Sequence, residues 1–241
     1  MARRFGRTGR RDGRLRLTAK PQQGRTAVLI SGSGSNLQAL IDAVSAQTVA
    51  LDIAVVFSNK PEAYGLQRAA AAGIACEVID NTAFQSREAY DAAVADCLLA
   101  YQPDCLMLAG FMRILSAEFV ARFAGRIINI HPSLLPAYPG LDTHQRVLDA
   151  GDPIHGCTVH FVTAELDGGP AIIRGTVPVL ANDDAVRLAA RVLDVEHQIY
   201  PLAASLLAEG RIRCDGDEVF LDDARLQSPI EFVDGHTTPA I

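Results

Sequence analysis

From residue 25 onward, short apolar runs alternate with longer segments of helical composition, and this alternation restricts the possible folds more than any other feature. The β-rich runs are TAVLI, DIAVVFS, ACEVI, DCLMLAG, RIINI, CTVHFV and AIIRGTVPV. Helices are predicted at residues 36–45, 64–72, 86–101, 117–123 and 183–209. A succession of strand, helix and strand favours a mainly parallel sheet with helices on both faces, and continuous apolar runs are typical of its central strands. We therefore predict an α/β fold with an open, twisted, Rossmann-like sheet.

The C-terminal half departs from this pattern. A loop without a helix separates CTVHFV from AIIRGTVPV, so we expect an antiparallel addition to the sheet there. The chain then divides into a basic extension (residues 1–25), a main domain (26–213) and a turn-rich tail (214–241) in which no regular element is predicted.

The composition is that of a soluble globular protein, with 49% apolar and 21% charged residues. No apolar run reaches the length of about 18 residues that a membrane span needs. The five cysteines are scattered and show no C-x-x-C spacing, which indicates free thiols in a reducing compartment and predicts a cytoplasmic protein without a disulfide framework.

Charge is unevenly distributed along the chain. Residues 1–25 hold nine of the 22 basic side chains and one acid, so the remainder carries 13 basic against 27 acidic side chains. The extension is interpreted as disordered or as the product of an upstream start codon, with a transit peptide and a nucleic-acid-binding arm as the alternatives. Because the body is acidic, we expect no nucleic-acid partner.

The first candidate site is the glycine-rich stretch LISGSGSNLQAL, where a strand runs into a turn and then a helix. Free backbone N–H groups and the positive end of a helix dipole favour phosphate at such a turn. Leu37 occupies the third glycine position of G-x-G-x-x-G, so the stretch is not a dinucleotide fingerprint. We expect Gly34, Ser35 and Asn36 to bind one phosphate of a mononucleotide-like substrate, and the alternative is a plain strand-to-helix connection.

The second candidate site is INIHPSLLPAYPG, in which Asn129 and His131 lie two residues apart at the end of an apolar run. In an extended segment these two side chains project from the same face, and ligands of open α/β sheets bind beyond the carboxyl ends of the strands. An Asn amide can donate to an oxyanion and an imidazolium can give a proton. The alternative is a buried His satisfied by its neighbour.

The third candidate site is the acidic loop TAELDGGPAI. Its Asp-Gly-Gly can be an ordinary turn, or Gly168 and Gly169 can let the backbone approach a ligand while Asp167 faces His131 and favours the charged imidazolium. His160 is interpreted as a structural residue of its strand. The other histidines show no metal-binding spacing, so no metal is expected.

Taken together, the three segments resemble the formyltransferase family that uses 10-formyltetrahydrofolate, in particular its members that act on glycinamide ribonucleotide. The resemblance covers about residues 26–210, and its motifs occur in order. After the glycine-rich turn these motifs are FSNK, SREAYD, LAGFMRIL, NIHPSLLP, HGCTVHFV, ELDGGP and EHQIYP. The resemblance implies a formyltransferase catalytic domain at 26–213 that acts in purine biosynthesis.

The resemblance also implies roles for individual residues. The catalytic group would be Asn129, His131 and Asp167. The residues that bind the ribonucleotide would be Gly34, Ser35, Asn36, Leu37, Gln38 and Glu196. The residues that bind the folate would be Arg87, Met112, Arg113, Ile114, Leu115, Asn129, Thr163, Ala164, Glu165, Leu166 and Asp167. Ser33 and Asp142 depart from some relatives, which leaves the role of Asp142 and of the nearby His144 open.

The implied mechanism is direct transfer. The substrate amine attacks the formyl carbon, Asn129 and His131 stabilise the developing oxyanion, and His131, supported by Asp167, moves protons. The alternatives are a formyltetrahydrofolate hydrolase, an enzyme similar to methionyl-tRNA formyltransferase, or a nucleotide-binding module without turnover. The expected ligands are glycinamide ribonucleotide and folate, with no membrane partner, and the expected state is a monomer or a homodimer.

Overall fold

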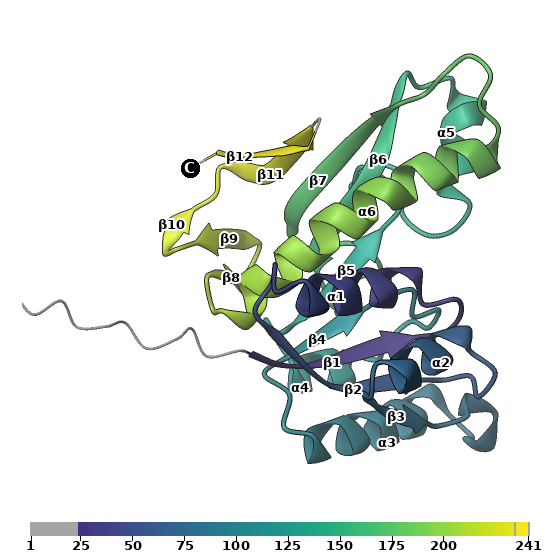
Figure 1. The fold of residues 1–241 in the computed structure, drawn as a ribbon, viewed down its shortest axis with the longest axis vertical. Coiled ribbons are helices and arrows are strands. Elements are labelled where there is room, and N and C mark those ends of the chain that lie inside the picture. Colours follow the sequence, from purple (N-terminus) through teal and green to yellow (C-terminus); the bar gives the residue numbers. More distant parts are fainter. Residues whose placement is uncertain (1–23, 234, 241) are drawn as a thin grey trace, which may run out of the picture.

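The computed structural model describes residues 24–233 and 235–240, and its centre is a twisted sheet of nine strands in the order β12-β11-β7-β6-β5-β4-β1-β2-β3 (Figure 1). The strands of its parallel half are β1 (Gly24–Ile30), β2 (Leu51–Ser58), β3 (Ala75–Val78), β4 (Cys105–Leu108) and β5 (Ile127–His131). Next to β5, the strands β6 (Ile154–Phe161) and β7 (Ala171–Pro178) are each antiparallel to the strand before them. The predicted α/β class and the antiparallel addition are both confirmed.

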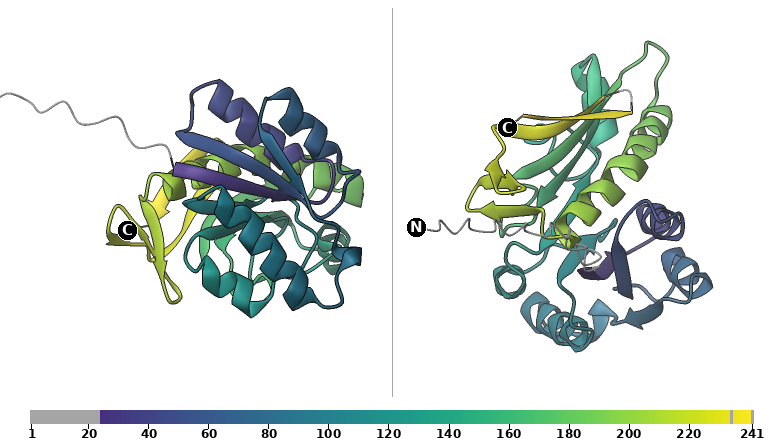
Figure 2. Two further views of the ribbon diagram at one scale, coloured as in Figure 1. Left: turned by 90° about the horizontal axis from the view of Figure 1, so that it is seen from below. Right: turned by 60° about the vertical axis from the view of Figure 1, so that its left-hand side comes forward.

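Helices cover both faces of this sheet, as Figure 2 shows for the parallel half. On one face lie α1 (Ser35–Ser45), α2 (Tyr64–Ala71), α5 (Thr143–Ala150) and the long α6 (Ala185–Ala208). On the other face lie α3 (Arg87–Ala100) and α4 (Ala117–Arg122), joined by the ion pair Arg122–Asp96 at 2.6 Å. Ser86, Ser116 and Asp184 cap α3, α4 and α6, since each side chain accepts a hydrogen bond from a backbone N–H of the first turn.

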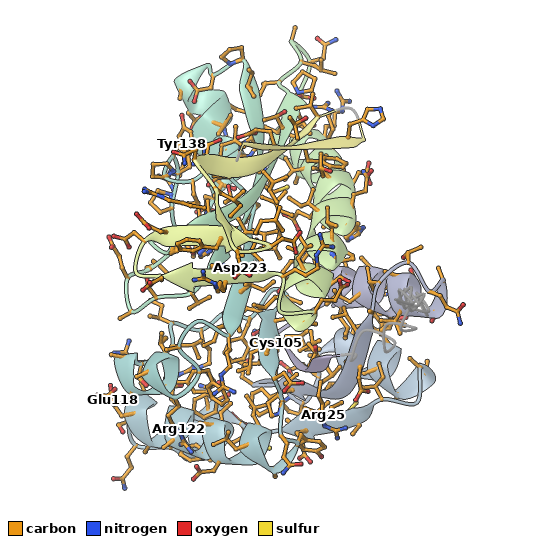
Figure 3. All side chains as sticks on the ribbon, turned by 90° about the vertical axis from the view of Figure 1, so that its left-hand side faces the viewer. Arg25, Cys105, Glu118, Arg122, Tyr138 and Asp223 are labelled. Atoms are coloured by element: carbon orange, nitrogen blue, oxygen red, sulfur yellow. The ribbon has the colours of Figure 1, made fainter. Side chains whose placement is uncertain are left out.

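Alternate residues of each central strand feed two separate core clusters. In β1, Val28 and Ile30 pack towards α1 and α6, whereas Ala27 and Leu29 pack towards α3 and α4. This double burial is the reason why the strand is apolar throughout. Figure 3 shows Cys105, at the start of β4, in the middle of the molecule, with Glu118 and Arg122 of α4 at its lower edge.

Residues after Arg213 form regular strands, although the sequence analysis predicts only a turn-rich tail. A small antiparallel sheet contains β8 (Ile212–Asp215), β9 (Glu218–Leu221) and β10 (Ala224–Arg225). The main sheet is then extended by β11 (Ser228–Val233), parallel to β7, and β12 (His236–Ala240). Ile230 and Phe232 of β11 are buried in the core. The tail is thus an integral part of the fold.

Two further expectations concern the ends of the chain and the membrane. Nearly all of the basic extension, residues 1–23, lies outside the described residues. Among residues 24–233 and 235–240, no helix is both long enough and apolar enough to cross a bilayer.

Candidate active site

The site begins at the carboxyl end of β5. Its Asn129 lies opposite Leu108 of β4 on one side and opposite His160 of β6 on the other. His131, two residues later, lies opposite Thr158. Both β5 side chains therefore leave the same face of the sheet, as the spacing predicts, and His131 is 6% exposed.

His131 and Asp167 form a buried ion pair. The Nδ1 atom of His131 lies 3.5 Å from Oδ2 of Asp167, and its Nε2 atom lies 3.0 Å from the carbonyl oxygen of Tyr138. Both ring nitrogens thus face oxygens that only accept, so the ring can donate to both of them only as the imidazolium. The amide of Gly140 donates to the same Asp167 oxygen at 2.8 Å, which fixes the carboxylate.

Asn129 is oriented by His160. Nδ1 of His160 donates to the carbonyl of Phe161 at 2.8 Å, which leaves Nε2 as an acceptor for the Asn129 amide at 3.2 Å. Burial lowers the pKa of His160 and keeps this ring neutral. Because one N–H of the Asn129 amide is used in this way, the other can donate to a ligand.

The sequence analysis does not place His160 beside the candidate catalytic residues, but the structure does. The ring is buried and has a partner at each nitrogen, as expected of a structural residue, and its Nε2 atom also lies 3.9 Å from Oδ1 of Asp167, so it lies between Asn129 and the ion pair. Its position could have been inferred from the sequence if β6 had been aligned antiparallel to β5, because Asn129 and His160 are then opposite each other.

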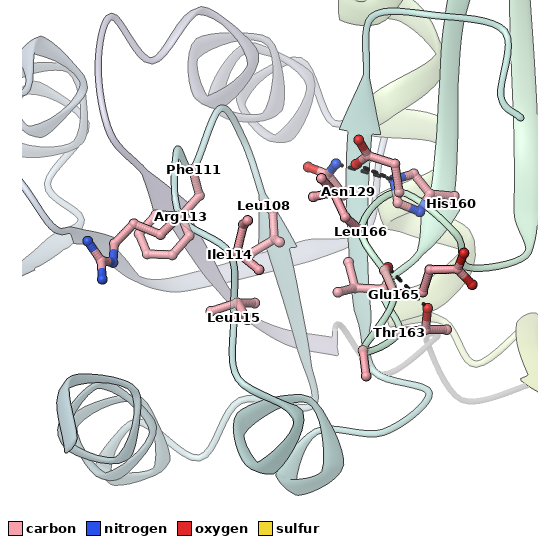
Figure 4. Close-up of a pocket in the computed structure, with 13 residues that line it drawn as sticks. Leu108, Phe111, Arg113, Ile114, Leu115, Asn129, His160, Thr163, Glu165 and Leu166 are labelled. Carbon is pink, nitrogen blue, oxygen red and sulfur yellow. Dashed lines mark hydrogen bonds and ion pairs between the residues drawn. The ribbon is translucent and has the colours of Figure 1, made fainter. Parts of the chain in front are cut away.

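A pocket opens beside Asn129 (Figure 4). Its residues come from β4 and the loop after it, from β5 and β6, and from the loop after β6. They are Leu108, Phe111, Arg113, Ile114, Leu115, Asn129, His160, Val162, Thr163, Ala164, Glu165, Leu166 and Asp167. The loop after β4 contributes mainly apolar side chains, while the Arg113 guanidinium points away from Asn129 and His160 in Figure 4.

Two of the predicted folate residues do not line this pocket. The backbone N–H of Met112 donates to Oγ of Ser31 at 2.8 Å, and the Met112 side chain is 64% exposed to solvent. Arg87 opens α3 and pairs with its neighbour Glu88 at 3.5 Å in an exposed position. The structure therefore brings the other nine predicted folate residues together and leaves these two outside the lining.

The glycine-rich turn between β1 and α1 has the features of a phosphate-binding loop. Gly34 caps α1 in the left-handed conformation, with φ of 68°, so the first amides of the helix are free of intrahelical partners. The turn rests on Gly65 of α2, whose N–H donates to the carbonyl of Gly32 at 3.0 Å. A Cβ on Gly34 would lie 2.6 Å from the Cα of Gly65, which requires the absence of a side chain.

The other five predicted ribonucleotide residues differ in their surroundings. The Nδ2 atom of Asn36 donates to Oε2 of Glu196 at 2.7 Å, which ties α1 to α6. Burial raises the pKa of Glu196 to about 6. The Leu37 side chain is fully buried in the core, so only its backbone can face a ligand. Ser35 and Gln38 line a second, wider hollow along α1.

Asp142 and His144 line neither of the two pockets. Asp142 precedes α5 in the left-handed conformation, with φ of 56°. Nδ1 of His144 lies 3.0 Å from Nε2 of His155, and burial lowers the pKa of both rings, that of His155 to about 4. Within the described residues, no group of three His, Cys, Asp or Glu side chains is arranged to hold a metal ion.

Comparisons of the sequence with known proteins give a consistent result. The model of the formyl transferase family matches residues 24–204. Phosphoribosylglycinamide formyltransferase of Escherichia coli (strain K12) is 53% identical over 199 residues, which cover 83% of this chain and 94% of that protein. The trifunctional purine biosynthetic protein adenosine-3 of Drosophila melanogaster is 52% identical over 188 residues, which cover 77% of this chain and 14% of the fly protein.

Solved structures agree with these relatives. Phosphoribosylglycinamide formyltransferase of Coxiella burnetii superposes with a TM-score of 0.84 at 43% identity, covering 87% of this chain and 99% of that one. Glycinamide ribonucleotide transformylase 1 of Symbiobacterium toebii superposes with a TM-score of 0.82 at 46% identity, covering 86% and 98%. The residues that match the family model run from β1 into α6 and include every candidate site residue.

Proposed function

The chain belongs to the formyl transferase family and is therefore an enzyme of formyl transfer, and we propose that it carries the formyl group from 10-formyltetrahydrofolate to the amine of 5-phosphoribosylglycinamide. The products are formylglycinamide ribonucleotide and tetrahydrofolate. The observation that carries this proposal is the cluster of Asn129, His131 and Asp167, two of which line the pocket.

The pocket suits the folate. Leu108, Phe111, Ile114 and Leu115 offer apolar contacts to a flat heterocycle, and the loop at 163–167 brings polar groups to its other side (Figure 4). Arg87 and Met112 are assigned to this ligand only by family resemblance, since neither side chain lines the pocket.

The turn at Gly34 suits the ribonucleotide. Its phosphate would lie at the amino end of α1, where Gly34, Ser35, Asn36 and Leu37 offer backbone N–H groups. Glu196 would accept hydrogen bonds from ribose hydroxyls. The loops after β1 and β4 adjoin, because Ser31 receives the N–H of Met112 and itself donates its N–H to the carbonyl of Gly110. The acceptor would therefore enter next to the donor.

The chemistry follows from which groups can donate. The amine nitrogen forms a bond to the formyl carbon and loses a proton, the bond from that carbon to the folate nitrogen breaks, and that nitrogen gains a proton. The free N–H of Asn129 and the His131 imidazolium stabilise the oxygen on which negative charge develops. Asp167 faces Nδ1 of His131 and would hold the ring in the orientation from which a proton is delivered to the folate nitrogen.

The test is tetrahydrofolate release, followed by absorbance, with 10-formyltetrahydrofolate alone and then with glycinamide ribonucleotide added. Release that depends on the ribonucleotide is the expected result. Equal release in both mixtures would identify water as the acceptor and overturn the proposal in favour of a hydrolase. The absence of release in both would indicate a binding module.

A further inference from the structure

The segment that follows β5 forms hydrogen bonds to both members of the buried ion pair, His131 and Asp167. The carbonyl of Tyr138 receives the Nε2 hydrogen of His131, and two residues later the amide of Gly140 donates to Oδ2 of Asp167. One short stretch of backbone therefore sets the position of the ring and of the carboxylate that faces it.

This stretch adopts an unusual conformation. Tyr138 has φ of 55° and Gly140 has φ of 80°, so both are in the left-handed region. Gly140 adopts this conformation without a steric penalty, but a tyrosine does so at a cost in free energy. The Tyr138 carbonyl can keep its direction only if other contacts hold the residue.

The side chain of Tyr138 supplies those contacts, at the end of the molecule that carries α5 (Figure 3). Its hydroxyl donates to Oδ2 of Asp152 at 2.5 Å, and the guanidinium carbon of Arg146 lies 5.3 Å from the centroid of its ring. Arg146 also donates to the carbonyl of Pro139 at 2.6 Å. Asp152 raises the pKa of the Tyr138 hydroxyl, which keeps this group a donor.

We propose that Tyr138, anchored by Asp152, is a positioning residue for His131: the anchored side chain fixes the carbonyl that holds the imidazole against Asp167. This inference rests on the proposed formyl transfer. It assigns Tyr138 no contact with either substrate.

The charge state of His131 depends on more than this carbonyl. Asp167 faces the ring directly, and His144, His155 and His160 are electrostatically coupled to it. Three of these four groups disfavour an additional positive charge when they are themselves protonated. The carbonyl of Tyr138 is therefore one of two acceptors that favour the imidazolium, and its displacement should be measurable.

The decisive variant is Tyr138→Phe, which removes only the hydroxyl. A displaced catalytic group can reduce the rate by up to about 100-fold, and we expect kcat to fall by about tenfold or more with both KM values nearly unchanged. The alkaline limb of the kcat profile should move to lower pH, because the imidazolium loses an acceptor. Asp152→Ala should have the same effect, and the double variant should show no further loss.

The chain offers a matched control in Tyr101, whose hydroxyl donates to Oε1 of Glu77, also at 2.5 Å, at the other end of α3 from Arg87. Tyr101→Phe should leave kcat and its pH profile unchanged. Asp152→Asn keeps an acceptor oxygen for Tyr138 and should restore most of the activity lost in Asp152→Ala.

The outcomes separate this inference from the proposed function. If the wild-type protein shows no release that depends on the ribonucleotide, the proposed function is wrong. If the wild type is active but Tyr138→Phe and Asp152→Ala both behave like Tyr101→Phe, the positioning role is wrong. Thermal unfolding of each variant shows whether a loss of kcat reflects loss of folded protein.

Discussion

At the scale of single residues, the site is explained by which atoms donate and which accept. His131 has an acceptor at each ring nitrogen, so its surroundings favour the form that can give a proton. In His160, Nδ1 faces the carbonyl oxygen of Phe161 and Nε2 faces the amide of Asn129. A neutral ring therefore satisfies both hydrogen bonds. The two histidines on neighbouring strands thus have different hydrogen-bond partners: both ring nitrogens of His131 face acceptors, whereas one ring nitrogen of His160 faces the Asn129 amide.

Asn129→Ala tests the proposed oxyanion donor. Removal of one such donor typically lowers turnover by about 10²- to 10³-fold, and we expect at least that loss in kcat. Because Asn129 is only partly buried, the fold should remain, as circular dichroism and thermal unfolding would verify. Near-normal turnover in a folded variant would remove Asn129 from the mechanism.

Glu196→Gln tests whether the buried carboxylate of Glu196 lowers the free energy of unfolding. Since burial raises the folded-state pKa from 4.5 to about 6, the folded protein holds a proton that the unfolded chain releases between these values. Stability therefore falls as pH rises through this window, by about 2 kcal/mol, and the full cost applies above pH 6. Glutamine carries no charge and can still accept from Asn36.

The free energy of unfolding in urea, measured at pH 4 and pH 7, distinguishes the two proteins. We expect Glu196→Gln to gain stability relative to the wild type between these pH values, and its KM for the ribonucleotide to rise. A difference between the proteins that does not change with pH would contradict the buried-carboxylate explanation.

At the scale of elements, the glycine-rich turn after β1 is shaped as much by α2 as by its own sequence. Gly65 lets α2 approach the turn closely, and Arg68, one turn later, donates through Nε to the carbonyl of Ser33 at 2.9 Å. Carbonyls of the turn are thereby directed towards α2. The support lies about 30 residues beyond the glycine-rich motif, so the motif alone does not reveal it.

Gly65→Ala should disturb this support. The added Cβ would lie 2.4 Å from Cδ1 of Ile30 and 3.2 Å from Cα of Gly34. Overpacking of this kind costs about 1–3 kcal/mol, and the turn should shift. We expect a higher KM for the ribonucleotide and an unchanged KM for the folate in steady-state kinetics.

Gln67→Ala, at an exposed position of the same helix, is the control for Gly65→Ala and should leave both KM values at the wild-type level. Equal changes in the two KM values of Gly65→Ala would mean that α2 supports the whole domain rather than the glycine-rich turn.

Much of the element order could be predicted from the sequence. The five predicted helices end within two residues of those in the structure, because apolar periodicity and the caps at Ser86, Ser116 and Asp184 mark them. The sequence analysis does not predict the short α5, which has eight residues and whose N-cap residue Asp142 makes no capping hydrogen bond. The strands after Arg213 are at most six residues long and are separated by turn residues, including Asp222 and Asp223 with positive φ.

The site was predictable only in part, for a related reason. Asn129, His131 and Asp167 carry reactive groups in recognisable motifs, whereas Tyr138 contributes a backbone carbonyl and His160 an acceptor nitrogen. Their use depends on the register of β5 against β6 and on the path of the loop after β5. Neither can be read from residue types alone.

At the scale of the whole molecule, the C-terminal strands extend the sheet on the far side of β6 and β7 from β5, which carries Asn129 and His131. β11 pairs with β7, which places two strands, β7 and β6, between it and β5. Stability and turnover should therefore respond differently to changes in β11.

Phe232→Ala tests this separation. The Phe232 side chain is 8% exposed and belongs to the main core cluster. Its truncation should lower the free energy of unfolding by about 3 kcal/mol, while kcat per folded molecule stays constant. Denaturant titration and single-temperature kinetics measure the two quantities.

Val233→Ala is the matched control, because Val233 lies next in β11 but is 49% exposed, so we expect little change in stability. A fall in kcat of Phe232→Ala at full folding would show that the C-terminal strands influence the site.

The candidate sites for the two substrates draw on different elements. The ribonucleotide would contact α1 and α6, and the folate would contact the loops after β4 and β6. Substitutions in α1 and α6 should therefore change which formyl acceptor binds without changing the binding of the folate donor. For protein engineering, α1 and α6 are therefore the elements to redesign if formyl transfer is to be directed to amines of other phosphorylated molecules.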